Sequence, residues 1–113
     1  MTKQNKRIKS ETYFHSLPEN LNCAQAILKG FQDEFNISDQ EIEEYRALGG
    51  GRTQDGICGA LYSAERLLSR AGKTGITTEF KTRVGAIHCL EIKKLKFQCI
   101  DCVRIADELL EKK

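Results

Sequence analysis

Apolar residues recur along this chain at intervals of three or four positions, and no segment alternates apolar and polar residues over five positions. That spacing is typical of one face of a helix. The pattern predicts helices at about residues 4–16, 21–35, 39–47 and 58–70, from Thr77 or Thr78 through Ile87, and from Cys99 to the last residues. We therefore expect an all-α fold, a compact bundle of five or six short helices that forms one domain over residues 1–113.

Polar residues mark the starts of the second and third of these helices. Asn20 or Asn22 can cap the helix that begins near residue 21, because a short polar side chain accepts a hydrogen bond from an unpaired backbone N–H. Ser38 followed by Glu41 has the spacing of a capping box. We therefore expect a break in the chain between these two helices.

The helix after residue 77 is less sharply bounded. Thr77 or Thr78 is the expected cap, and the apolar pattern continues through Ile87. Cys89 is expected at the end of this helix or in a kink, and residues 87–92 either continue the helix or bend into a second short turn. His88 precedes Cys89 and could be a metal ligand, but neighbouring helical side chains point about 100° apart, so we favour a helix-end histidine.

A glycine-rich loop precedes the central helix. It begins with Gly49-Gly50-Gly51 and continues through Gly56. Cys58 then lies near the helix start, where unpaired N–H groups and the helix dipole favour a thiolate with a lowered pKa. Gly50, Gly51 and Gly56 could supply backbone N–H donors to a bound group. Arg52 could stabilise an anion there, although a solvated loop charge is the favoured interpretation.

Composition excludes several classes of function. The formal net charge is +2 and the pI is about 8.3, below the basicity expected of a nucleic-acid-binding domain. The chain has no run of 18 apolar residues, so no membrane span is predicted, and no secretory signal is visible. We therefore expect a cytoplasmic protein that binds no nucleic acid and inserts into no membrane. Its redox partner is unidentified, and a homodimer is left open.

Five cysteines are the main anomaly in a chain expected in a reducing compartment, where structural disulfides are rare. For any single cysteine we favour packing in the core, but for the set we favour metal binding or thiol redox chemistry. Cys99 and Cys102 form a CxxC pair, a weak signal without a second pair or a βαβ context.

Several motifs together resemble a known family. They are Asn22-Cys23-Ala24-Gln25-Ala26-Ile27-Leu28, Gly49-Gly50-Gly51, Cys58-Gly59-Ala60, Val84-Gly85-Ala86-Ile87-His88-Cys89 followed by Leu90, and Cys102-Val103. This set is similar to the family of redox-active proteins named for its C…CGAxxG…C…C cysteine pattern. The resemblance covers about residues 10–110.

The resemblance implies four shared cysteines, which fall on Cys23, Cys58, Cys89 and Cys102, and Cys99 is then additional. The chain departs from the pattern at Ser63, where the second glycine of CGAxxG would be, and this departure affects local packing more than chemistry. A similar domain occurs in split-Soret c-type cytochromes, where cysteines are thought to hold an iron–sulfur centre. The chain has no Cys-x-x-Cys-His, so we expect no covalent haem.

Three functions remain open. In the first, Cys23, Cys58, Cys89 and Cys102 ligate an iron–sulfur cluster or another metal for electron transfer. In the second, the protein is metal-free and uses redox thiols, with Cys58 as the attacking thiol and Cys23 as a second redox cysteine. In the third, the chain is a structural or adaptor bundle with reduced cysteines in its core. No named enzymatic reaction is supported.

Two structural expectations follow from these hypotheses. The four shared cysteines should converge at one end of the bundle. In the absence of metal, Cys58 should be the most reactive thiol, more reactive than Cys99.

Overall fold

The computed structural model describes residues 8–15, 20–48, 53 and 56–113, and helices joined by turns and loops make up most of this part of the chain. The elements are α1 (Ser10–Tyr13), α2 (Cys23–Gly30), α3 (Gln32–Phe35), α4 (Asp39–Glu44), the 3₁₀ helix η1 (Tyr45–Leu48), α5 (Gly59–Arg70), α6 (Thr77–Val84), α7 (Cys89–Lys94) and α8 (Cys99–Glu111). The predicted all-α fold is confirmed. Among these residues there are eight α-helices, more than the expected five or six.

Two breaks in the predicted helices account for the additional elements. The segment predicted at 21–35 divides at Phe31, whose backbone (φ −114°, ψ 18°) leaves the helical region between α2 and α3. The segment predicted through Ile87 ends at Val84, because Gly85 takes a left-handed conformation with φ 102°. Of the two alternatives for Cys89, a position at the end of the helix is wrong and a break before a second short helical segment is confirmed, since Cys89 is the first residue of α7.

The two polar caps are confirmed in the structure. The Asn22 side chain accepts from the Gln25 N–H at 2.8 Å, and the Gln25 side chain accepts from the Asn22 N–H at 3.1 Å, which completes a capping box. The Ser38 hydroxyl accepts from the Glu41 N–H at 3.0 Å. Short polar residues therefore mark these helix starts correctly.

The cap predicted at Thr77 or Thr78 is wrong. Ile76 occupies the N-cap position of α6 and no side chain caps the helix from there. Glu65 of α5 replaces the cap, because its carboxylate accepts from the Ile76 N–H at 2.7 Å and from the Thr77 hydroxyl at 2.6 Å. A contact with another helix therefore stabilises the start of α6, where the local sequence predicted a threonine cap.

The first predicted helix is short in the described region. Only Ser10–Tyr13 is helical, and residues 1–7 and 16–19 lie outside the described residues. The Ser10 N–H donates to Asp107 Oδ2 of α8 at 2.8 Å, and both residues are fully buried. This bond fastens α1 to α8.

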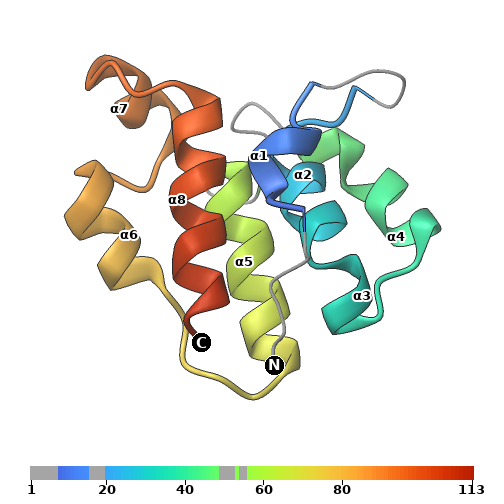
Figure 1. Ribbon diagram of the computed structural model, residues 1–113. Coiled ribbons are helices and arrows are strands. Elements are labelled where there is room, and N and C mark those ends of the chain that lie inside the picture. The colour runs from blue at the N-terminus through green and yellow to red at the C-terminus, as the bar shows by residue number, and fades with distance from the viewer. Residues whose placement is uncertain (1–7, 16–19, 49–52, 54–55) are drawn as a thin grey trace.

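Helices α2, α5 and α8 form the centre of the bundle, with α1 packed across α2 and α8 and α6 beside α8 (Figure 1). Their facing side chains are fully buried, among them Ile27, Leu28, Leu67, Val103 and Ala106. By contrast, α7 lies at one corner of the molecule and packs little against the other helices. Among the described helices, none has the length and apolar content to cross a membrane.

Candidate functional site

All five cysteines line one small cavity between α2, the start of α5, α7 and the start of α8. We call this site the cysteine pocket. Its described lining residues are Cys23, Cys58, Gly59, Cys89, Ile92, Lys93, Phe97, Cys99 and Cys102. The cavity volume is about 20 Å³, enough for roughly one water molecule or a single ion. The predicted convergence of the four shared cysteines is therefore confirmed.

Close packing of two helix starts brings Cys23 and Cys58 together. Cys23 is the first residue of α2 and Cys58 is the N-cap of α5. A Cβ atom added at Gly59 would lie 2.7 Å from Cys23 Sγ and 3.3 Å from Ala24 Cβ, too close for an unmoved neighbour. The glycine after Cys58 therefore permits the approach of α5 to α2.

Ser63 contributes to the same helix pair one turn further along α5. It is fully buried, and its hydroxyl donates to the Ala24 carbonyl of α2 at 2.8 Å. A hydrogen bond between the helices thus satisfies the buried hydroxyl of Ser63, the position at which the sequence resemblance led us to expect a glycine.

A backbone link holds the start of α7 beside the start of α5. The Cys58 N–H donates to the Ile87 carbonyl at 2.8 Å, and Ile57 pairs with His88 in an isolated antiparallel bridge. Because His88 is directly followed by Cys89, this link brings Cys89 to Cys58. Residues 31 positions apart in sequence therefore supply neighbouring thiols.

The two cysteines of the CxxC pair come from the first turn of α8. Cys99 is its first residue and Cys102 its fourth, a separation that places both on one face. The Gln98 N–H donates to Asp101 Oδ2 at 3.2 Å and orders this turn. The pair therefore faces the pocket as a unit, with Cys102 almost fully buried and Cys99 partly exposed.

The surroundings of Cys58 disfavour its thiolate. Its pKa is raised well above 9.0, first by a hydrogen bond between its thiol and that of Cys102 and then by burial. The backbone N–H groups of Ala60 and Leu61 act in the opposite direction but do not prevail. The lowered pKa that the sequence predicted for Cys58 is therefore wrong, because burial and a second thiol outweigh the helix start.

Cys99 differs from the other four cysteines in its exposure. Cys23, Cys58, Cys89 and Cys102 are buried, whereas Cys99 is intermediate. Partial burial raises the pKa of Cys99, and the charges of Cys23, Cys89 and Cys58 raise it further, while Lys93 lowers it. Cys99 is therefore the thiol nearest to solvent in an electrostatically coupled group.

The remaining predicted site residues are not among the described residues that line the pocket. Gly50, Gly51 and Arg52 are outside the described residues. Gly56 has φ 70°, and its N–H donates to the Thr53 carbonyl at 3.0 Å rather than into the pocket. His88 Nδ1 lies 3.4 Å from a carboxylate oxygen of Glu91, as expected of a histidine at a helix end.

Three residues that complete the pocket were not predicted from the sequence: Ile92, Lys93 and Phe97. Lys93 belongs to the basic run Lys93-Lys94-Leu95-Lys96, whose only sequence signal was charge. Its position four residues after Cys89 on α7 places it on the same helix face as that cysteine. Periodicity measured from Cys89 could have identified it.

The cysteine side chains of the pocket are of a kind that can bind a metal ion, but their arrangement is not that of a metal site. Thiolates suit zinc, copper(I) and iron–sulfur clusters. Within the described residues, however, no three cysteine, histidine or carboxylate side chains are grouped so that they could hold a metal ion. A cavity of about 20 Å³ would fit a single ion, and a multi-iron cluster would require the pocket to widen.

Comparison with known families agrees with the cysteine arrangement. Residues 21–113 match the model of the family described as "Putative redox-active protein (C_GCAxxG_C_C)". Neither a curated protein nor a solved structure shows significant similarity to the chain. The match covers most of the chain and contains every one of its cysteines, so the chain belongs to this redox-active family.

Proposed function

We propose that this family member transfers electrons at the cysteine pocket, through an iron–sulfur cluster or another thiophilic metal held by Cys23, Cys58, Cys89 and Cys102. The observation that supports this proposal is the convergence of thiols from four separate segments on one cavity. Dithiol chemistry needs two cysteines, whereas Cys₄ ligation needs four. A set of five at one place exceeds the requirement of a single disulfide.

The protein's own residues have defined roles in such a centre. The four buried cysteines would be the ligands, and each would have to lose its thiol proton for a metal to bind. The raised pKa of Cys58 makes that loss costly in the absence of metal, so metal binding is expected to strengthen as pH rises. When bound, an iron–sulfur centre supplies reversible electron transfer at a potential set by burial and nearby hydrogen bonds.

A second candidate function is favoured by the contact between Cys58 and Cys102. The Cys102 thiol is the largest cause of the raised Cys58 pKa, and both cysteines line the same small cavity. Joining them as a disulfide would release two electrons and two protons to an oxidant such as a partner disulfide, which becomes two thiols. In this metal-free alternative, Cys58 pairs with Cys102, whereas the sequence analysis selected Cys58 and Cys23.

The experiment is purification of the full chain without oxygen, followed by an absorption spectrum and analysis of iron, sulfide and other metals. Charge-transfer absorption with bound metal supports the first function. A colourless, metal-free protein that reversibly loses two thiols on oxidation supports the second. Five thiols that remain unreactive would contradict both and favour a structural bundle.

Two cysteine variants make this experiment specific. Cys102→Ser removes a proposed ligand and is expected to abolish metal binding or, in the alternative, the reversible disulfide. Cys99→Ser is the matched control, one turn away on the same helix, and is expected to retain either activity. Equal losses in the two variants would contradict the assignment of the four ligands.

A further inference from the structure

The surface beside the cysteine pocket combines exposed apolar and basic side chains in one short segment. In the described part of the chain, three of the four large apolar side chains that are exposed lie here: Leu90 (74% exposed), Leu95 (49%) and Ile100 (41%). Lys93, Lys94 and Lys96 are exposed between them. We call these six residues the α7 surface.

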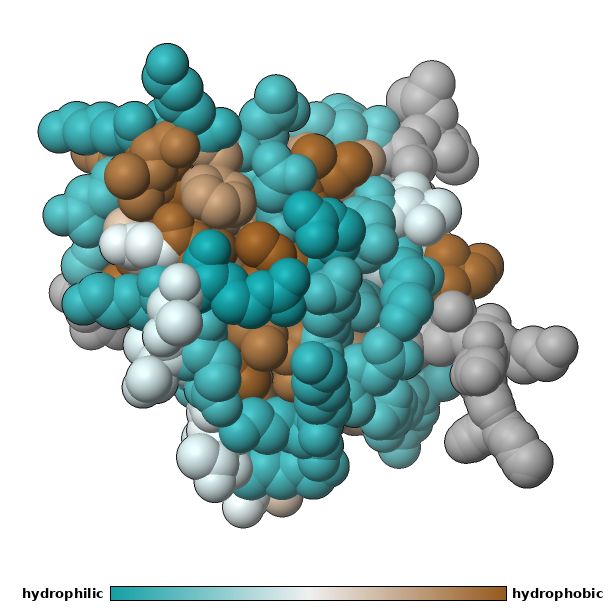
Figure 2. Space-filling model, turned by 60° about the vertical axis from the view of Figure 1, so that its left-hand side comes forward, coloured by the Kyte–Doolittle hydropathy of each residue, from teal (hydrophilic) through white to brown (hydrophobic). Residues whose placement is uncertain are grey.

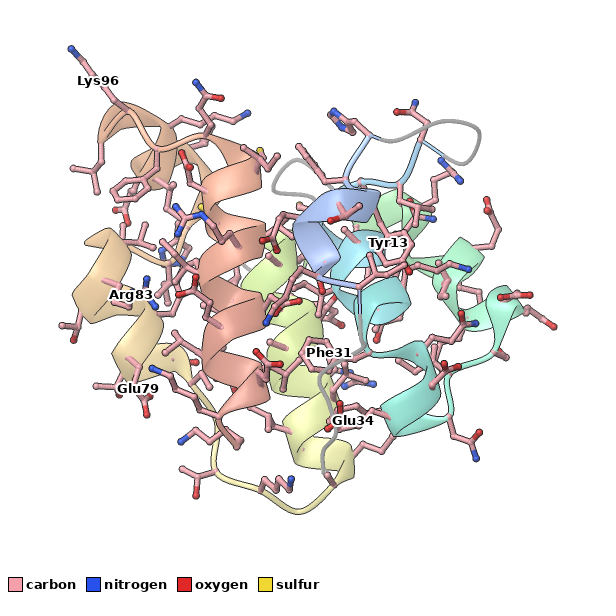
Figure 3. The ribbon with its side chains drawn as sticks, in the orientation of Figure 1. Tyr13, Phe31, Glu34, Glu79, Arg83 and Lys96 are labelled. Atoms are coloured by element: carbon pink, nitrogen blue, oxygen red, sulfur yellow. The ribbon has the colours of Figure 1, made fainter. Side chains whose placement is uncertain are left out.

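The α7 surface also carries an excess of positive charge. Residues 89–98 contain three lysines and one glutamate, which gives this segment a formal charge of +2. The formal net charge of the whole chain is also +2. The glutamate, Glu91, lies 3.4 Å from the ring of His88, whereas Lys94 and Lys96 form no ion pair among the described residues. The Lys96 side chain points away from the body of the protein beyond α7 (Figure 3).

This surface adjoins the pocket directly. Leu90 follows Cys89 and Ile100 follows Cys99, while Lys93 lines the cavity itself. Cys99, the partly exposed thiol, also comes from this segment. Figure 2 brings the side with α6 and α7 forward and shows apolar side chains among hydrophilic ones on the surface.

We propose that the α7 surface is the docking site for a second redox protein with an acidic surface, which exchanges electrons with the cysteine pocket. The proposal rests on the proposed function, because it identifies the partner class of the same site. Redox partners form small transient interfaces, in which complementary charge accelerates encounter. A few exposed apolar side chains with lysines around them match this requirement, and contact here brings the partner next to Cys99.

The protein probe is a reduced flavodoxin with an acidic face. Stopped-flow absorbance measures its electron transfer to the oxidised full chain. Lys94→Glu/Lys96→Glu reverses two charges outside the pocket lining. We expect the second-order rate at low salt to fall about tenfold, since electrostatic steering contributes 10-fold or more. The difference should vanish near 0.5 M salt, where screening acts within about 4 Å.

Two further variants separate docking from a general charge effect. Arg66→Glu/Lys112→Glu makes the same change in net charge at exposed positions of α5 and beyond the end of α8, and should leave the rate within about twofold. Leu90→Ser removes an exposed apolar contact without a change in charge, and should lower the rate about threefold at any salt. Equal losses in the two charge variants would overturn the docking site.

Reductive titration with dithionite distinguishes this proposal from the proposed function. If all variants take up electrons from dithionite but the flavodoxin rate does not change with the α7 surface, the docking proposal is overturned and the proposed function stands. No uptake from dithionite would overturn both. The same variants are also tested for binding to vesicles that contain one-third phosphatidylserine. If the unaltered chain binds these vesicles, Lys94→Glu/Lys96→Glu abolishes the binding, and the flavodoxin rates are unchanged, then the α7 surface binds membranes and the docking proposal is overturned.

Discussion

The bundle centre and the cysteine end are built differently. In the centre, α2, α5 and α8 contact one another along their lengths, and side chains such as Leu67 and Val103 are fully buried. At the cysteine end, α7 contributes Cys89 and Ile92 to the interior but leaves Leu90 and its lysines exposed. The centre is suited to stability, whereas the other end leaves apolar and basic side chains exposed to solvent.

This difference separates the closely packed core from the cluster of thiols. Apolar burial of roughly 25 cal/mol per Å² operates mainly where α2, α5 and α8 meet. At the cysteine end a small cavity interrupts the packing, and α7 buries only Cys89 and Ile92. Local opening should therefore begin at α7, since elements with few buried contacts open at the lowest free energy.

The largest expected effect comes from a truncation in the centre. Leu67→Ala should lower the free energy of unfolding by about 2–5 kcal/mol, because it leaves a cavity at a fully buried position. Leu90→Ala, the matched control on α7, should change it by less than about 0.5 kcal/mol. Urea denaturation of both variants measures the difference. Comparable losses would show that α7 is as well packed as the centre.

A substitution at the boundary tests how the two regions are joined. Gly59→Ala should destabilise the protein by about 1–3 kcal/mol, because its new Cβ would overlap Cys23 Sγ and press on Ala24. Ser69→Ala, an exposed position on the same helix, is the control. Urea denaturation gives the stability, and titration of reactive thiols in the folded state should show Cys23 becoming more accessible. Unchanged stability would mean that α2 and α5 can move apart without loss.

The order of thiol reactivity is expected to reverse the prediction from sequence. In reduced, metal-free protein, Cys99 should be alkylated at least about tenfold faster than Cys58, since Cys58 is buried with a strongly raised pKa and Cys99 is partly exposed. Iodoacetamide labelling followed by mass spectrometry gives both rates in one sample. The structural assignment fails if Cys58 reacts at the same rate as Cys99 or faster.

The smallest expected effect is a dependence of stability on alkaline pH. The pKa of Cys58 is higher in the folded than in the unfolded protein, so above pH 9 the unfolded chain loses the proton first. The folded state then binds more protons, and rising pH lowers the free energy of unfolding by at most about 1.4 kcal/mol per pH unit from this group. This stabilisation is fully present below the unfolded pKa.

The control for this effect is Cys58→Ala. Urea denaturation under reducing conditions at pH 7.5 and pH 10 should show a smaller loss for the variant than for the unaltered chain. Groups that do not interact with Cys58 titrate equally in both proteins, so the difference reports Cys58 together with the thiols whose titration it influences, such as Cys99. Identical losses would indicate that its pKa is not raised by folding.

The sequence alone determined the helical class and several of the helix boundaries. Spacing of apolar residues predicts helices because the 3.6-residue period is a local property, and Asn22 and Ser38 cap helices through bonds that span three residues. The cysteine pattern, through the family resemblance, also indicated which four cysteines would meet. Each of these features depends on residues close in sequence or on a pattern shared by relatives.

Tertiary structure decided the remaining features of the site. The bond from the Cys58 N–H to the Ile87 carbonyl and the start of α7 at Cys89 depend on how distant segments pack. The pKa of Cys58 depends on burial and on Cys102, 44 positions away, both absent from local sequence. Helix starts predict a lowered thiol pKa only while they remain solvated. In this protein, packing removes water from the start of α5. Desolvation and a neighbouring thiol then raise the pKa of Cys58 by more than the partial charge of the helix end lowers it.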